Sequence, residues 1–426
     1  MIPSRRINQE IIKNYRIICD AEPDNIENWL TLGRCLVEDE QYDEAEKALT
    51  KIFEEGRFFS FKNGRPRLRF KTLFGFFKNK LLFARAYSDM AMISLYQGNM
   101  AEAERRLTLA MCEFEKAKDD DEYAKAANRL GMVYRLAGAF ESAEEMHYRA
   151  KDIAKKLNKN ALLAETLGDL GMVYEGKDRF LVALEHHKES LKLYEADPNR
   201  AFEAACQKRQ IGLCCLRAND FDQALIYLNA SLDDFKNLGS YVFQSRLYND
   251  LALVYQAQGD LDTAVEIAEK SVKAADLSQD GTEKADNRVL LACLEMAREN
   301  LKDELESLLK DAVEYYKSAD LKTQLANACS TLGLFYLRRK DWKQADSLFR
   351  DSLHLEEMLH RSFGMASDLG NLGLIAQKTG NHAKAAEYWH KAAVLFEEGG
   401  NDEMAKKFNA LSKEAKSDLE ATLLRE

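Results

Sequence analysis

The pentapeptide Leu130-Gly131-Met132-Val133-Tyr134 recurs unchanged 40 residues later as Leu170-Gly171-Met172-Val173-Tyr174. Extending this offset in both directions finds a small residue at nine positions, spaced by 40 or 41 residues except for one gap of 58. These nine positions are Gly33, Ala91, Gly131, Gly171, Gly212, Ala252, Ala292, Gly333 and Gly373. A fixed period of this length indicates an array of structural repeats.

A second column of small residues lies 12 positions after the first, and eight of its nine members are alanine. The column comprises Ala45, Ala103, Ala143, Ala183, Ala224, Ala264, Glu304, Ala345 and Ala385. Small residues on facing helices allow the two backbones to approach closely. Between the columns, Gly98, Gly138, Gly259 and Gly380 occupy one shared slot, which is typical of a residue that ends a helix in the left-handed conformation. The pattern predicts a helix, a tight turn and a second helix in each repeat.

This pattern resembles the tetratricopeptide repeat family, and Trp29-Leu30-Thr31-Leu32-Gly33 is similar to the opening of its first helix. The resemblance implies an all-α fold, a right-handed α-solenoid of about nine helix-turn-helix repeats. The period of 40 is similar to that of the long-helix subclass found in the spindle adaptor Pins and in kinesin light chains. The resemblance also implies that the first helices line a concave face on which other proteins bind.

The register divides the chain into five segments, with a capping helix or half repeat at its N-terminus and a capping helix at its C-terminus. The predicted segments are 1–26 (N-terminal cap), 27–56 (first repeat), 57–80 (insertion), 81–400 (repeats two to nine) and 401–426 (C-terminal cap). The seventh repeat departs from the pattern at Glu295 and Glu304, which leaves its register open.

Composition narrows the classes of function. A formal net charge of −10 disfavours general nucleic-acid binding, because the phosphate backbone repels an acidic protein. The eight cysteines form no CxxC pair, which is typical of inert thiols in a reducing cytosol. No stretch approaches the length of a transmembrane segment, and the N-terminus lacks the apolar core of a signal peptide. We therefore expect a cytoplasmic protein.

The insertion differs from the rest of the chain, because residues 56–80 contain eight basic residues, seven phenylalanines and no acidic residue. We expect contacts from Phe58, Phe59, Arg65, Arg67, Arg69, Phe74, Phe76 and Phe77. Four alternatives remain open: the segment docks on its own acidic body, binds a protein partner, binds an anionic membrane surface as a peripheral contact, or stacks on nucleotide bases.

The resemblance assigns a partner-binding groove to recurring positions on the first helices. An apolar floor follows the small column, and charged or amide side chains flank it. The predicted groove residues are Arg85, Met92, Lys125, Asn128, Met132, Arg135, Met172, Arg209, Leu213, Arg217, Arg246, Asn249 and Arg338. Nine basic and five acidic positions in this register favour an acidic peptide or amphipathic helix as partner. The alternative is that the methionines pack between helices and the arginines are solvated.

Sequence motifs for catalysis are absent: there is no phosphate-binding loop, nucleophile elbow or HExxH motif. His147 and His187 lie 40 residues apart, in a slot that Phe349 and Trp389 fill elsewhere, so we interpret both as packing residues. We expect no catalytic residue, no cofactor and no metal. The predicted function is a protein-interaction scaffold or adaptor. The alternatives are a regulatory receptor that changes shape on binding a signal peptide or small ligand, and a membrane or nucleic-acid contact through residues 57–80.

Overall fold

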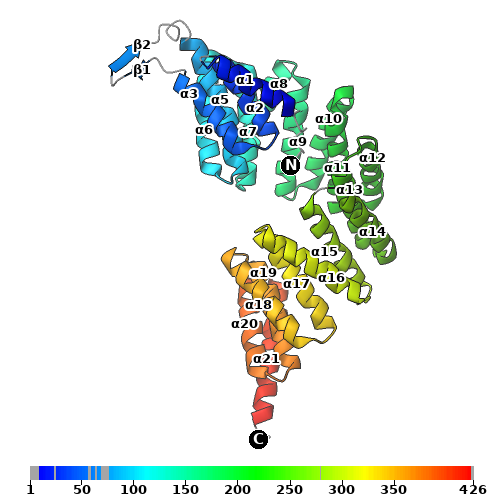
Figure 1. The fold of residues 1–426 in the computed structure, drawn as a ribbon. Helices are drawn as coiled ribbons and strands as arrows, with labels where there is room; N and C mark the ends of the chain where they lie inside the picture. The colour runs from blue at the N-terminus through cyan, green and yellow to red at the C-terminus, as the bar shows by residue number, and fades with distance from the viewer. Residues whose placement is uncertain are drawn as a thin grey trace. The chain divides into compact units, whose positions relative to one another are not determined.

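The computed structural model describes residues 9–23, 25–55, 59–62, 65–68, 76–278 and 280–423, and the side chains of 11–23, 25–53, 80–278 and 280–418. The chain divides into two compact bodies, Met1–Asp220 and Phe221–Glu426, here called the N-terminal half and the C-terminal half. Apart from one β-hairpin and one short 3₁₀ helix, the described elements are α-helices (Figure 1). The predicted all-α repeat fold is confirmed.

The N-terminal half is a series of antiparallel helix pairs that follows one leading helix, α1 (Gln9–Ala21). Its pairs are α2 (Ile26–Glu38) with α3 (Tyr42–Glu55), α5 (Phe76–Tyr96) with α6 (Met100–Ala117), α7 (Asp120–Leu136) with α8 (Phe140–Lys156), and α9 (Asn160–Gly176) with α10 (Phe180–Glu195). The short helix η1 (Pro198–Arg200) then leads into α11 (Ala201–Arg217).

The C-terminal half begins with α12 (Phe221–Asn237) and ends with the long helix α21 (Asp402–Leu423), which packs on α20. Its pairs are α13 (Tyr241–Gln258) with α14 (Leu261–Leu277), α15 (Gly281–Ala297) with α16 (Asp303–Ser318), α17 (Lys322–Arg338) with α18 (Trp342–Met358), and α19 (Ser362–Lys378) with α20 (His382–Glu398). Helices α11 and α12, predicted as the fifth repeat, belong to different halves.

The insertion contains a two-stranded antiparallel hairpin of β1 (Phe59–Lys62) and β2 (Arg65–Leu68), with Phe59 opposite Leu68 and Lys62 opposite Arg65. Helix α5 begins at Phe76, so the last residues of the predicted insertion belong to the second repeat. Among the predicted contact residues, Phe58, Arg69 and Phe74 lie outside the described residues. The side chains of Phe59, Arg65, Arg67, Phe76 and Phe77 also lie outside the described part, so the four alternatives for this segment stay predictions.

The turn within each of the nine repeats has a residue with positive φ at the same position, seven after the small residue. Four of these residues are glycines with φ between 77° and 83°. The other five are Glu40, Asp178, Asn219, Glu299 and Lys340. The turn geometry is therefore kept even where glycine, which adopts it without strain, is missing.

The small column lets a side chain from the second helix pack directly against the backbone of the first. A Cβ atom added to Gly131 would lie 2.6 Å from His147 Nε2, and one added to Gly171 would lie 2.4 Å from His187 Nε2. Both histidines are fully buried, as the packing interpretation predicts. The glycine in the first helix and the ring in the second are therefore one fitted pair.

The seventh repeat is a complete helix pair whose second helix is shifted by one residue relative to the sequence register. Glu304, which the register places in the alanine column, is exposed, whereas Leu305 is 5% exposed and packs in the core. The Tyr336 hydroxyl donates to Glu306 at 2.6 Å, directly after Leu305. Elsewhere Tyr134 donates to Glu104 and Tyr174 to Glu144, and in both cases the glutamate directly follows the column alanine. The assignment of Glu304 to the column was wrong, because the turn after α15 is longer than in the other repeats.

Replacing Gly373 by alanine should destabilise the protein more than replacing Gly333 by alanine. A Cβ at position 373 would lie 2.4 Å from Nε1 of Trp389, whose ring is buried and donates to the Gly370 carbonyl at 3.0 Å. At position 333 the closest atom, in Phe349, is 3.0 Å away. Overpacking costs about 1–3 kcal/mol, against about 1 kcal/mol gained by alanine in a helix. Urea denaturation of both variants measures the difference, and equal midpoints would contradict the fitted-pair account.

Candidate functional site

The first helices of successive repeats line the inner side of each half. Direct contacts join α5 to α7 and α7 to α9 in the N-terminal half, and α13 to α15 and α15 to α17 in the C-terminal half. Within the described residues, successive second helices make no comparable contact. A stack that is narrower on one side curves toward that side, so we call the surface of the first helices the inner face.

A row of half-buried apolar side chains runs along the inner face of the N-terminal half. It consists of Met92, Met132, Met172 and Leu213, each directly after a small-column residue. Met92 and Met132 also pack against the core between α5 and α7. Met92 and Met132 therefore contribute to packing, and all four side chains are partly exposed, so their role as the floor of a groove stays a prediction.

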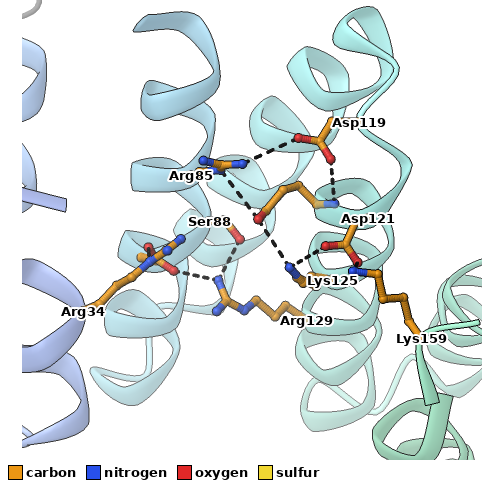
Figure 2. A network of polar contacts seen from close by, with 10 residues as sticks. Arg34, Arg85, Ser88, Asp119, Asp121, Lys125, Arg129 and Lys159 are labelled. Carbon is orange, nitrogen blue, oxygen red and sulfur yellow. Dashed lines mark hydrogen bonds and ion pairs between the residues drawn. The ribbon is translucent and has the colours of Figure 1, made fainter. Parts of the chain in front are cut away.

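The basic side chains at the start of this face are paired with carboxylates of the same protein. Arg85 lies 3.7 Å from Asp119 and 3.6 Å from Glu122, and Lys125 lies 2.9 Å from Asp121 (Figure 2). These three carboxylates lie at the N-terminus of α7, outside the positions that the sequence analysis compared between repeats. Acidic residues at this end of a helix also stabilise the helix dipole.

A second polar network ties three first helices together. Asp89 of α5 is buried and accepts from Arg34 of α2 at 2.7 Å and from Arg129 of α7 at 2.9 Å. Arg129 also donates to Ser88 at 2.8 Å, as Figure 2 shows. Sequence analysis missed Asp89, Arg129 and Ser88, although a charged residue two before the small column in successive repeats could have indicated this link.

The two predicted amide groups are used within the protein. Asn128 is 3% exposed, donates to Asp169 at 2.8 Å, and its Oδ1 lies 2.8 Å from Nδ1 of His147. Asn249 donates to Asn287 on the next first helix. Asn128 is thus too buried to pair with the backbone of an extended ligand, and this part of the predicted groove is corrected.

The remaining predicted arginines differ in their surroundings. Arg246 is paired with Glu283 at 2.5 Å, Arg338 donates to the Met296 carbonyl, and Arg209 also interacts within the protein. Among the described residues, no hydrogen bond or ion pair engages Arg135 or Arg217. Carboxylates of the protein itself therefore pair with Arg85, Lys125 and Arg246, whereas Arg135 and Arg217 have no such partner among the described residues.

One cluster at the far end of this half combines three kinds of metal-binding side chain. Glu175 of α9, His187 of α10 and Cys214 of α11 place one ligand atom each within 4.8 Å of the others. Glu175 Oε1 lies 2.8 Å from His187 Nε2 and 3.4 Å from Cys214 Sγ. Burial and the nearby Glu175 raise the pKa of Cys214, so the free thiol is protonated. Sequence analysis missed this cluster because no short motif joins residues so far apart in the chain.

Exchanging Asp169 for asparagine should make stability less dependent on pH. Burial and the neighbouring Glu165 raise the pKa of Asp169 from 3.8 to about 7. The folded state then binds this proton more tightly than the unfolded state, so the free energy of unfolding falls as pH rises from about 4 to 7. The substitution would remove the buried charge and keep the size of the side chain. We expect Asp169→Asn to raise Tm at pH 8 by about 2 °C or more, with no gain at pH 4.

The matched control is Asp152→Asn, an exposed position on α8. It should shift Tm equally at both pH values. If Asp169→Asn instead lowers Tm more at pH 8 than at pH 4, the carboxylate is stabilised as an anion in the folded protein, and the assigned direction of the pKa shift is wrong.

None of the described helices is long and apolar enough to cross a membrane. Comparison with protein families finds the tetratricopeptide repeat model at residues 82–156, 122–196 and 203–276. No curated protein sequence matches the chain.

Several solved structures share the fold at low sequence identity. Aspartyl phosphate phosphatase F from Bacillus subtilis is 15% identical, with a TM-score of 0.55 over 78% of this chain and 94% of that one. A signal transduction ATPase with a tetratricopeptide repeat sensor from Pyrococcus horikoshii is 16% identical, with a TM-score of 0.55 over 84% of this chain and 54% of that one. A Rap protein complexed with competence and sporulation factor is 16% identical, with a TM-score of 0.50 over 79% of this chain and 98% of that one. With their recurring helix pairs and their family matches, residues 82–196 and 203–276 are identified as tetratricopeptide repeats.

Proposed function

We propose that this chain is a non-catalytic binding protein that holds a peptide or amphipathic helix of a partner protein on the inner face of its N-terminal half. The observation that carries the proposal is the half-buried row Met92, Met132, Met172 and Leu213. It is accompanied by Arg135 and Arg217, which form no ion pair with any other described residue. Methionine side chains are flexible and polarisable, so they adapt to different apolar side chains of a ligand. A row on successive parallel helices fits the apolar stripe of one bound segment.

The ion pairs that Arg85 and Lys125 form within the protein limit how acidic the ligand can be. A ligand carboxylate that binds Arg85 or Lys125 must displace Asp119, Asp121 or Glu122, which already hold them. Arg135 and Arg217 lie in the last turns of α7 and α11, and a carboxylate can bind them without that cost. We therefore propose a ligand that is mainly apolar on one side and acidic at a few positions, rather than strongly acidic throughout.

The similar structures support the binding role only as analogy, because at 15–16% identity they share the fold. One of them was solved with a bound factor, which agrees with binding on such an array. The phosphatase name belongs to another of them and is not carried over to this chain. Asp169, whose pKa burial raises, is 8% exposed and accepts a hydrogen bond from Asn128, which favours a structural role.

Selection from a random peptide library, followed by calorimetric titration of the enriched peptides, tests the proposal. We expect enriched peptides to combine apolar residues with a few Asp or Glu residues. Arg135→Glu and Arg217→Glu should each weaken binding by about tenfold or more, because each removes a charge-assisted hydrogen bond and adds repulsion. Met132→Lys should weaken binding similarly by placing a charge in the apolar row.

Lys155→Glu on α8 and Lys192→Glu on α10 are matched controls, because they make the same charge change at exposed positions of second helices. Both should keep the affinity within about twofold, as expected for screened surface charges. Peptides that bind the inner-face variants and the controls equally well would show that the ligand lies elsewhere.

A further inference from the structure

The cluster Glu175, His187 and Cys214 draws its three side chains from three different helices of the N-terminal half. His187 and Cys214 are almost completely buried, while the Glu175 side chain is 28% exposed and opens the cluster to solvent. It is the only group of three or more His, Cys, Asp or Glu side chains with this proximity in the part of the chain that the structure describes. Packing of an ordinary repeat needs none of the three chemical types.

The preceding repeat provides an internal comparison. His147 occupies the position of His187 and packs against Gly131 as His187 packs against Gly171. Its neighbours in the same register are Arg135 and Val173, where the next repeat has Glu175 and Cys214. Packing a histidine against the glycine therefore requires neither a carboxylate nor a thiol. The presence of Glu175 and Cys214 beside His187 is not explained by packing alone.

The orientation of the imidazole also fits a metal ligand. Nδ1 of His187 lies 2.8 Å from Oε1 of Gln207, and Nε2 points to Glu175. In metal sites, a hydrogen bond to one ring nitrogen fixes the tautomer and directs the other nitrogen to the ion. Gln207 of α11 is placed to do this for His187.

We propose that Glu175, His187 and Cys214 bind a divalent transition metal ion, with Zn²⁺ as the expected ion. Thiolate, imidazole and carboxylate together favour zinc over magnesium or calcium, which prefer oxygen ligands alone. Coordination replaces the contacts that Glu175 makes with the ring nitrogen and the thiol, and the thiol proton passes to water. Water occupies the fourth position on the exposed side of Glu175. The site ties α9, α10 and α11 together and is independent of the ligand proposed for the inner face.

Titration of the full chain, freed of metal by a chelator, with Co²⁺ tests the site. We expect one equivalent to bind and to give a thiolate-to-cobalt charge-transfer absorption that Zn²⁺ then removes. Zn²⁺ should also raise Tm. Cys214→Val, which introduces the residue that the preceding repeat has at this position, and His187→Phe, which introduces the ring found at Phe349, should each abolish the absorption.

Glu175→Gln keeps the shape of a half-exposed side chain and should weaken metal binding by about tenfold or more without unfolding the protein. The controls are His147→Phe, the same change in the preceding repeat, and Cys215→Ala, the adjacent buried cysteine outside the cluster. Both should keep the absorption and the shift in Tm. The proposal is overturned if the unaltered protein shows no thiolate absorption with Co²⁺ and no gain in Tm with Zn²⁺, or if the absorption persists in Cys214→Val.

Discussion

The close approach of the two helices of a repeat, which a glycine or alanine in the first helix allows, is the constraint on which the rest of the structure depends. At Gly131, Gly171 and Gly373 the opposing ring lies where a Cβ atom would be, so the helices could not pair at this distance with any larger residue. Because a single helix pair leaves much of its apolar surface exposed, the pairs must stack on one another. Because every helix pair must pack on the next one in the same way, the pattern of small residues recurs about every 40 residues in the sequence.

Stacking also determines the chemistry of the inner face. Adjacent first helices approach closely enough for polar side chains to join them, as Asp89 does with Arg129 and Asn128 does with Asp169. In the C-terminal half, Ser330 donates to Asp368 in the same way at 2.9 Å. A buried polar group without its partner would cost free energy, so these pairs favour one register between neighbouring repeats. They also reduce the number of polar side chains that remain for a ligand.

The third and fourth repeats show how one packing solution can support different chemistry. Both repeats bury a histidine against a glycine. This packing depends on the shape of the ring, so the two ring nitrogens can still form polar contacts. In the third repeat, burial lowers the pKa of His147 to about 3, and the positive charge of the nearby Arg135 contributes a smaller part of this shift. The ring therefore stays neutral. In the fourth repeat a carboxylate and a thiol surround the second nitrogen instead. The repeat framework tolerates this change because the size of the ring, not its polarity, fits the glycine.

The sequence by itself determined the repeat, the glycine slot of its turn and its first column of small residues, because each of these recurs at a fixed offset along the chain. Gly171 with His187, or Gly98 in its turn, can be recognised by comparing repeats. Only the tertiary structure decided which side chains of the inner face are paired, because such pairs join different repeats. The ion pair between Asp89 and Arg129 is one example. It also decided the shifted register of α16 and the meeting of Glu175 with Cys214. These features depend on differences between neighbouring repeats, and a repeated pattern contains no information about such differences until the helices are packed together.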